Sequence, residues 1–346
     1  MNINSTWRSP SNIALVKYWG KHHPQIPANP SISFTLDQCY TETTLSLLEK
    51  KVNSADAYDL EVLLDGESQP GFKPKITKFL NSIQEEVPFI KDYHLRIETH
   101  NSFPHSSGIA SSASGMSALA LCLLSISEEL SGQPDKDFYH KASQWSRLGS
   151  GSASRSVYGG LVEWGQFANL PESHDEYAVP YQGTVHPVFR DFCDYVLLVE
   201  TGSKKVSSTA GHGLMENHPY AERRFLQAHE NLSRLLDTIA HGEVDDFGAI
   251  VESEALTLHA MMMTSSPYFI LMKPNTVHIL EQVWTFRKET GHPLYFTLDA
   301  GANVHLLFPA AIEQAVKEFV SNSLTGYLKN GQYICDRVGQ GPVKIS

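Results

Sequence analysis

The sequence predicts an α+β protein in which layers of strands and helices pack on one another. In the segment 93–97, apolar and polar residues alternate as in a half-buried strand, and the segment 111–130 then places Ala, Leu and Met at helical spacing. Two short apolar runs, 294–298 and 304–308, are separated by five residues that include a glycine, which is typical of a hairpin. This mixture favours layers with functional loops at the strand ends.

The chain is predicted to divide into two halves near residue 185. Its 346 residues, 41% of them hydrophobic, can bury one large core or two modest ones. The segment 169–187 contains Pro and Gly and is interpreted as a loop between an N-terminal domain at 1–185 and a C-terminal domain at 186–346. The elements expected in the second domain, besides the hairpin, are a buried strand at 195–199 and helices at 221–239 and 310–324.

Bulk properties argue against several classes of partner. The formal net charge of −11 disfavours nucleic acid and anionic membranes, because the long-range field repels polyphosphate. The longest apolar runs, such as 118–124, are much shorter than the roughly 20 residues that span a bilayer. The N-terminus lacks a basic segment followed by an apolar run. We therefore predict a cytoplasmic protein that binds neither nucleic acid nor membrane.

Cysteine and histidine do not by themselves predict a metal centre. The four cysteines lie far apart, which fits neither a disulfide framework nor a zinc site with short ligand spacing, so we interpret them as reduced. Among the 16 histidines there is no HExxH motif, and His22 and His23 have no further ligands nearby at a suitable spacing. We therefore interpret the histidines as solvated or structural.

The segment 104–115 has the composition of a phosphate-binding loop. It joins the predicted strand to the predicted helix, and its small residues let backbone amides approach a ligand at the positive end of the helix dipole. Ser111 and Ser112 add hydroxyl groups that can donate to phosphate or bind a phosphate-bound Mg²⁺. The segment is neither a Walker A motif nor GxGxxG. The alternative is that its serines only cap the helix.

This loop and three other segments resemble one enzyme family. Residues 104–113 match the pattern Pro-x-x-x-Gly-x-x-Ser-Ser-Ala of the GHMP kinase superfamily, and 11–21, 149–164 and 296–303 are similar to signatures of its diphosphomevalonate decarboxylase family. Residues 204–211 more weakly resemble a loop on the nucleotide side. The resemblance implies an N-terminal half like the second domain of ribosomal protein S5, a ferredoxin-like C-terminal half, an active site in the cleft between them, and a homodimer.

The reaction of that family converts mevalonate 5-diphosphate and ATP into isopentenyl diphosphate, ADP, phosphate and carbon dioxide through a 3-phosphorylated intermediate. A tertiary hydroxyl is a poor leaving group, whereas phosphate departs readily and leaves carbocation-like charge that loss of the neighbouring carboxylate can quench. The resemblance therefore implies mevalonate 5-diphosphate as the small-molecule substrate, with ATP as cosubstrate and Mg²⁺ as its metal.

The resemblance also implies four catalytic residues. Asp299 lies in the turn after a predicted strand, where its carboxylate can orient the 3-hydroxyl or accept its proton; the alternative is a bond to its own turn. Lys17 is expected beside it, holding the carboxylate ionised and offsetting charge, unless it is an exposed lysine. Arg155 can hold the substrate carboxylate through two parallel hydrogen bonds. Asn12 is expected to bond that carboxylate or Arg155, unless it belongs to a structural turn.

Two further sets complete the expected site. The residues expected around the 5-diphosphate, besides Arg155, are Tyr18, Lys21, Ser150, Gly151 and Ser152, with Lys73 or Lys75 assisting. The residues expected around ATP are Gly108, Ala110, Ser111, Ser112, Lys204 and Lys205, with Ser112 also a metal ligand. The alternative for the last two lysines is plain solvent exposure.

Three departures from the family pattern bear on the substrate. Pro30 lacks a backbone donor, His22 and His23 replace a basic-acidic pair, and His212 stands where Met is common. All are expected near the substrate rather than the phosphate loop. They leave open the same chemistry on mevalonate 5-phosphate, or a kinase that stops at the 3-phosphate. A non-catalytic ligand-binding protein on the same scaffold is the alternative from another class.

Overall fold

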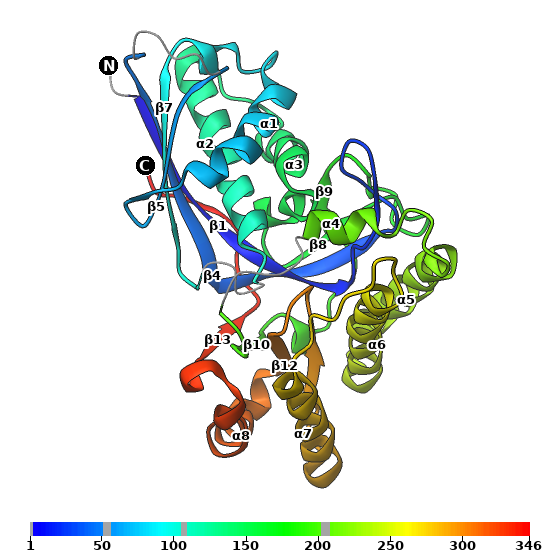
Figure 1. Cartoon of the computed structure of the whole chain (residues 1–346). Coiled ribbons are helices and arrows are strands. Elements are labelled where there is room, and N and C mark those ends of the chain that lie inside the picture. The colour runs from blue at the N-terminus through cyan, green and yellow to red at the C-terminus, as the bar shows by residue number, and fades with distance from the viewer. Residues whose placement is uncertain (1–2, 51–56, 105–108, 202–207) are drawn as a thin grey trace.

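The computed structural model describes residues 3–50, 57–104, 109–201 and 208–346. Its α+β architecture confirms the predicted fold class: an eight-stranded sheet carries helices on one face, and a four-stranded sheet with its own helices packs below it (Figure 1). A third, two-stranded sheet is formed by the short strands β2 (Lys21–His22) and β3 (Ile26–Pro27).

The first sheet contains the two longest strands of the described residues. Its strands are β1 (Ile3–Val16), β4 (Ser31–Leu48), β5 (Asp59–Leu64), β6 (Glu67–Ser68), β7 (His94–Asn101), β8 (Leu161–Trp164), β9 (Ala178–Pro180) and β14 (Val343–Lys344). The main path is β14-β1-β4-β7-β5-β6, with β8 paired to β4 and β9 to β8. The β5–β7 pair is parallel and the other pairs are antiparallel.

Buried polar residues explain why β1 has no apolar period. Ser9 and Ser11 are fully buried on this strand. The Ser9 hydroxyl donates to Ser156 O at 2.8 Å, and the Ser11 hydroxyl donates to Ile109 O at 2.7 Å. Because these bonds satisfy the buried hydroxyls, the strand can lie at the centre of the fold without the alternation that predicts strands.

Three helices cover one face of this sheet: α1 (Lys73–Ile83), α2 (Ser111–Ser131) and α3 (Phe138–Gly149) (Figure 1). α2 is apolar on all sides because it packs between the sheet and α3. Of the described helices it alone is long and apolar enough to cross a membrane, and 72% of its apolar window is buried inside the fold. The predicted strand at 93–97 and helix at 111–130 are confirmed.

The second sheet is antiparallel, with β11 (Tyr295–Thr297), β12 (Val304–Pro309), β10 (Phe192–Leu197) and β13 (Tyr333–Arg337) side by side in that order. Successive residues of β10 face opposite cores: Phe192 and Val196 pack toward β4, whereas Tyr195 and Leu197 pack in another core below. The helices of this half of the chain are α4 (Ser208–Gly213), α5 (Ala221–His241), α6 (Val244–Met263), α7 (Pro274–Thr290) and α8 (Glu313–Phe319).

Most predicted elements of the second half are confirmed. The hairpin is the β11–β12 pair, in which Thr297 lies opposite His305. The helix at 310–324 is broken into a 3₁₀ turn, α8 and a π turn. The prediction that 169–187 is only a loop is wrong, because β9 lies within it and pairs with β8; three residues are too few to show a period. β14 lies near the C-terminus but pairs with β1 of the N-terminal half, so the chain crosses between the halves more than once. The division near residue 185 stays a prediction.

A buried carboxyl on β8 makes the stability depend on pH. Glu163 is 3% exposed, and its Oε2 has no hydrogen-bond partner in the described part of the chain. Burial, with a smaller contribution from the charge of Glu172, raises the pKa of Glu163 to about 7.

Glu163→Gln is therefore expected to stabilise the fold at alkaline pH. The pKa of the carboxyl is about 7 when folded and 4.5 at its ordinary value, so the penalty is absent below pH 4.5, grows as pH rises and is complete above pH 7. At about 1.4 kcal/mol per pH unit the penalty is on the order of 3–4 kcal/mol. Thermal unfolding should give a higher midpoint for the variant at pH 8 and equal midpoints near pH 4.5. Equal midpoints at pH 8 contradict this account.

Candidate active site

A cavity of about 400 Å³ opens where the two sheets approach each other, and we call it the main cavity. Its wall comes from the end of β1, the start of α2, a 3₁₀ turn at Gly151–Val157, α4, α6 and the β11–β12 turn. The predicted site residues that line it are Asn12, Lys17, Tyr18, Lys21, Ala110, Ser112, Ser150, Gly151, Ser152, Arg155 and Asp299. Ser111 lines a neighbouring cavity instead. Gly108, Lys204 and Lys205 lie outside the described residues.

An ion pair between Lys17 and Asp299 lies on the wall of the main cavity. Lys17 Nζ is 3.2 Å from Asp299 Oδ1, although the two residues are 282 positions apart. Lys17 is only 1% exposed, so it is not the exposed lysine of the alternative interpretation. Burial lowers the pKa of Lys17 and the charge of Asp299 opposes that shift. The pair therefore holds a carboxylate and an ammonium ready beside the cavity.

The turn that carries Asp299 is fixed from two sides. The main-chain oxygen of Asp299 accepts hydrogen bonds from Gly301 N–H at 2.7 Å and from His259 Nε2 of α6 at 3.1 Å. The side chain of Asp299 remains 28% exposed. A fixed main chain with a partly exposed carboxylate suits a group that must meet a substrate.

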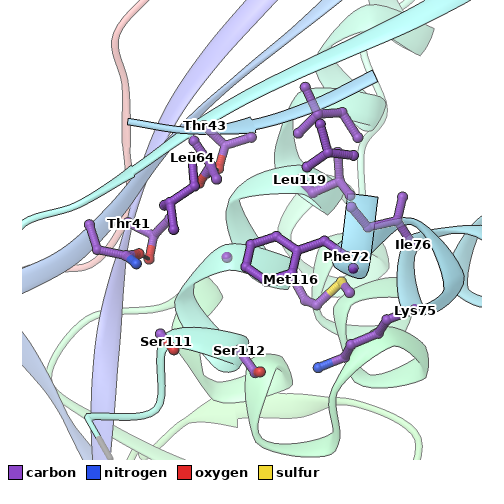
Figure 2. A pocket seen from close by; sticks show the side chains of 16 residues that line it. Thr41, Thr43, Leu64, Phe72, Lys75, Ile76, Ser111, Ser112, Met116 and Leu119 are labelled. Atoms are coloured by element: carbon purple, nitrogen blue, oxygen red, sulfur yellow. Dashed lines mark hydrogen bonds between the residues drawn. The ribbon is translucent and has the colours of Figure 1, made fainter. Parts of the chain in front are cut away.

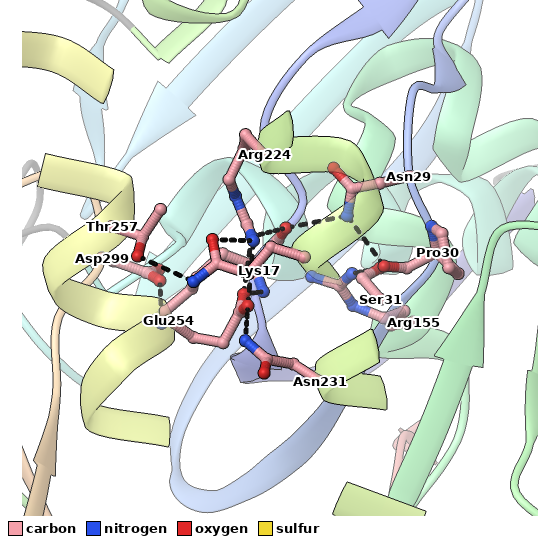
Figure 3. Close-up of polar contacts among 11 residues, drawn as sticks. Lys17, Asn29, Pro30, Ser31, Arg155, Arg224, Asn231, Glu254, Thr257 and Asp299 are labelled. Atoms are coloured by element: carbon pink, nitrogen blue, oxygen red, sulfur yellow. Dashed lines mark hydrogen bonds and ion pairs between the residues drawn. The ribbon is translucent and has the colours of Figure 1, made fainter. Parts of the chain in front are cut away.

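The main chain of Lys17 is held by a buried network that we call the Glu254 network: Arg224, Asn231, Glu254 and the main chain of Lys17 (Figure 3). Glu254 Oε2 accepts the Lys17 N–H at 2.8 Å, and Arg224 Nη2 donates to Lys17 O at 3.1 Å. The Arg224–Glu254 ion pair has no exposed side-chain surface. Helices α5 and α6 thereby clamp the chain at the residue whose ammonium reaches Asp299.

Sequence reasoning missed this network. A glutamate within a helix is normally expected to be exposed to solvent. The contacts of Glu254 also join segments more than 200 residues apart, so neighbouring residues do not indicate them. One signal was present. Glu254 follows Val251 by three positions and precedes Leu258 by four, so it lies on the apolar stripe of its helix.

Breaking the network is expected to cost both stability and turnover. Glu254→Gln leaves the Arg224 charge buried without its partner, which typically costs about 3–5 kcal/mol, and releases the main chain of Lys17. We expect a lower unfolding midpoint and, below that temperature, a kcat reduced by roughly tenfold for the loss of about one positioning bond. The matched control is Glu230→Gln, which breaks the exposed Arg223–Glu230 pair on α5, the helix that carries Arg224. Unchanged kcat per folded molecule for Glu254→Gln would make the network purely structural.

Arg155 is oriented by hydrogen bonds that leave part of its guanidinium available. Nε and Nη2 donate to Asn12 Oδ1 at 3.3 and 3.2 Å, and Nη1 donates to Ser31 Oγ. These bonds use three of the five N–H groups of an arginine. Burial lowers its pKa to about 10, and the charge of Asp299 opposes the shift, so it stays a cation. Asn12 is expected to bond either the substrate carboxylate or Arg155, and in the structure it contacts Arg155.

The 3₁₀ turn after α3 brings small residues close to Tyr18. A Cβ atom on Gly151 would lie 2.8 Å from Tyr18 Oη and 2.9 Å from the Trp164 ring, so only glycine allows this packing. Ser150 and Ser152 flank it on the cavity wall. The turn thus presents main chain and hydroxyls to a ligand.

One end of the main cavity is cationic. Lys21 and Lys75 both line it, whereas Lys73 does not. Desolvation lowers the pKa of Lys75 to about 8, with the positive charge of Lys21 adding to the shift. Like charges gathered in this way fit an anionic group such as a phosphate.

A second, largely apolar cavity of about 230 Å³ opens beside the main cavity, and we call it the apolar cavity. Lys75 and Ser112 line both cavities, and Figure 2 shows them at one end with Phe72 and Met116 deeper inside. The first residues of α2 therefore lie where the two cavities meet.

The start of α2 is open to a ligand rather than capped. Its first residues are Ser111 and Ser112, and no side chain in the described part of the chain caps the helix. The N–H groups of a first helical turn have no partner within the helix, so they can bind an anion. The alternative that these serines only cap the helix is not supported.

Magnesium chemistry fits the oxygen atoms near this position. No cluster of three or more His, Cys, Asp or Glu side chains suited to a metal occurs within 3–50, 57–104, 109–201 and 208–346. Ser112 and Asp299 supply a hydroxyl and a carboxylate to one cavity. Mg²⁺ is commonly bound by one or two carboxylates together with substrate phosphates, so the donor set matches a phosphate-bound ion.

Only one of the three departures lies on the cavity wall. His22 and His23 are exposed and Pro30 is buried, and none of them lines the main cavity. For these residues, the expectation that they lie near the substrate therefore gains no support from the cavity wall and stays a prediction. The β2–β3 hairpin projects the two histidines into solvent, and Pro30 precedes β4, where Asn29 Nδ2 donates to its carbonyl at 2.8 Å. His212 does line the cavity.

Comparison with known proteins finds matches along most of the chain. A diphosphomevalonate decarboxylase-like N-terminal domain matches residues 9–178, and a mevalonate 5-diphosphate decarboxylase C-terminal domain matches residues 195–343. The diphosphomevalonate decarboxylase of Bos taurus is 28% identical over 336 residues, which cover 91% of this chain and 78% of the relative.

Solved structures match the whole fold. The mevalonate diphosphate decarboxylase of Staphylococcus aureus has a TM-score of 0.84 and 30% identity, covering 100% of this chain and 99% of its own. A structure of MDDEF in complex with MVAPP, AMPPCP and magnesium has a TM-score of 0.85 and 28% identity, with 100% of both chains covered. The likeness thus extends to sequence as well as fold.

Proposed function

The chain belongs to the diphosphomevalonate decarboxylase family, and from this premise we propose that it phosphorylates mevalonate 5-diphosphate with ATP and decarboxylates the product to isopentenyl diphosphate. The observation that carries the proposal is the meeting of a carboxylate, a buried ammonium and a buried guanidinium in one cavity. These are Asp299, Lys17 and Arg155. A kinase for a simple primary alcohol would have no use for a carboxylate anchor.

The first step transfers a phosphoryl group to the 3-oxygen of the substrate. Asp299 orients the 3-hydroxyl and takes its proton as the oxygen attacks the γ-phosphorus of ATP. The ammonium of Lys17, 3.2 Å from Asp299 Oδ1, offsets negative charge that gathers on the transferred group. The products of this step are ADP and a 3-phosphate ester, whose phosphate is a far better leaving group than hydroxide.

The second step breaks two bonds and forms two. The C3–O bond breaks and phosphate leaves with its electron pair. The C1–C2 bond breaks and its pair forms the π bond between C2 and C3, while a lone pair of the carboxylate oxygen forms the second C=O bond of carbon dioxide. Arg155 supports this step because its free N–H groups can hold the carboxylate in line with the departing phosphate. Carbon dioxide then departs as a neutral molecule.

The nucleotide would occupy the apolar cavity and the start of α2. The apolar walls suit a flat base, and the N–H groups of the helix terminus suit the phosphates. Ser112, which lines both cavities, would hold Mg²⁺ together with the phosphates, and the ion would neutralise charge on the β- and γ-oxygens. Ser111 then faces the nucleotide rather than the substrate.

The cationic end of the main cavity would receive the 5-diphosphate. Lys21 and Lys75 supply positive charge there, and Ser150, Gly151 and Ser152 supply hydroxyls and main-chain donors. A cytoplasmic location and a homodimer, with no nucleic acid or membrane partner, belong to the same proposal and follow from the family and the acidic charge.

Product analysis with purified protein tests the proposal. Mevalonate, its 5-phosphate and its 5-diphosphate are offered separately with ATP and Mg²⁺, and ADP and carbon dioxide are measured together. We expect equal release of both from the diphosphate alone. Preference for the 5-phosphate, ADP without carbon dioxide, or silence with all three would replace the proposal with another substrate, a 3-kinase or a non-catalytic protein, respectively.

A further inference from the structure

His212 of α4 is a buried ring on the wall of the main cavity. It lies between two aromatic side chains: its centroid is 4.2 Å from that of Tyr18 and 4.6 Å from that of Trp19, with interplanar angles of 35° and 38°. Both neighbours follow directly after Lys17 in the chain. The imidazole is therefore held in one place by the segment that carries the catalytic lysine.

The hydrogen bond at one ring nitrogen fixes the position of the ring proton. Gly20 N–H donates to His212 Nδ1 at 3.0 Å, so this nitrogen must carry a lone pair. Burial, with the charge of Lys21 adding to the shift, lowers the pKa of His212 to about 3, so the ring is neutral at working pH. A neutral imidazole has one N–H group, and here it must be on Nε2.

Nε2 of His212 has no hydrogen-bond partner among the described residues. It is also not one of the unpaired side-chain atoms of these residues that are closed off from solvent, so it is accessible. Since His212 lines the main cavity, the open side of the ring is the cavity itself. A neutral donor thus faces the space where a ligand would lie, and no described residue offers it an acceptor.

The surroundings of His212 identify the kind of ligand. Lys21, Gln25 and Lys75 line the same cavity, and Lys21 is the charged residue whose field acts on the imidazole. Asp299 is the one carboxylate among the described residues on the cavity wall, and it is paired with Lys17. The side of the cavity near His212 therefore offers donors and positive charge, which suit phosphate oxygens.

We propose that His212 is a specificity-determining residue that donates Nε2–H to a phosphate oxygen at the 5-position of the substrate, an inference that rests on the proposed function. A donor held in a buried site discriminates because a substrate without the phosphate leaves it unpaired. Because the imidazole is neutral, it adds a directional hydrogen bond to the attraction supplied by the charges of Lys21 and Lys75, and it does not add to the repulsion between those charges. His212 thereby helps the site to reject unphosphorylated mevalonate.

Two substitutions separate the donor from the structural bond. In His212→Asn, the amide oxygen can still accept from Gly20, but no group replaces Nε2–H. In His212→Gln, the longer side chain can place an amide N–H near the former Nε2. Both variants lose the ring stacking equally, so a difference between them reports on the donor.

For His212→Asn we expect the KM for mevalonate 5-diphosphate to rise about 10-fold or more, as for loss of one hydrogen bond to a charged group, with kcat within about threefold. For His212→Gln we expect KM to stay within about threefold. The KM for ATP should change in neither. Wild-type KM in His212→Asn, equal losses in both variants, or a loss confined to His212→Gln would each overturn the inference, because each assigns the role to packing or to Gly20.

A direct binding measurement keeps this test separate from the proposed function. Calorimetry with inorganic pyrophosphate, using wild type and His212→Asn, needs no turnover. Weaker binding to the variant by about 10-fold supports the donor, and equal binding overturns it. If the wild type has no decarboxylase activity yet shows this difference, the proposed function fails while the anion contact of His212 stands.

Discussion

Asp299→Asn is expected to reduce kcat by about 10²–10⁴-fold, the range that a positioned acid–base group contributes, while ATP binding stays within a few-fold. The change removes charge with little change in volume. It also removes the negative charge that raises the pKa of Lys17, so the pKa of this buried lysine falls further and its ammonium is lost at a lower pH. The measurements are steady-state kcat and calorimetric binding of a non-hydrolysable ATP analogue.

Near-normal turnover in Asp299→Asn would remove the residue from the mechanism. Its control is Asp191→Asn, which changes an exposed aspartate paired with Arg337 in the same half of the chain. That variant should keep kcat within about twofold, since exposed ion pairs contribute little. A similar loss in both variants would indicate a general effect of charge rather than catalysis.

Arg155→Lys is expected to lower kcat/KM by on the order of 100-fold or more, because lysine cannot reproduce a planar clamp of two charge-assisted hydrogen bonds. Because the lysine ammonium has fewer donors than the guanidinium, the substitution also leaves Asn12 Oδ1 and Ser31 Oγ without their guanidinium partner. The measurement is kcat/KM for mevalonate 5-diphosphate, with the unfolding midpoint recorded in parallel.

The matched control for Arg155→Lys is Arg287→Lys. Arg287 holds Glu252 through two bonds of 2.7 and 3.1 Å, and it lies outside the main cavity. We expect this control to lose stability but to keep kcat/KM within about twofold. Unchanged kinetics in Arg155→Lys would exclude the guanidinium from carboxylate binding.

Local patterns predicted the elements that carry the chemistry. The hairpin that presents Asp299 follows from two short apolar runs around a glycine-containing turn. The start of α2 at Ser111 follows from a switch in period after a strand. These features depend on neighbours within a few residues, so a single sequence contains them. The roles of the site residues came from the resemblance and stay predictions.

Long-range contacts could not be predicted in the same way. β1 and β4 are among the longest strands, but β1 has buried polar residues that erase its period, as at Ser9 and Asn12. The Glu254 network joins residue 17 to residues 224 and 254, and nothing in the local sequence around Lys17 specifies these partners. The stacking of His212 against Tyr18 likewise depends on how distant segments meet.

The measurement that tests the central claim most directly follows the 3-oxygen of the substrate. Mevalonate 5-diphosphate carrying ¹⁸O in its 3-hydroxyl is converted with unlabelled ATP, and the inorganic phosphate is analysed by mass spectrometry. If that oxygen is phosphorylated in the main cavity and then leaves as part of the phosphate, each inorganic phosphate carries one ¹⁸O atom. Unlabelled phosphate, with the label in water, would contradict the account, because the hydroxyl would then have left without being phosphorylated.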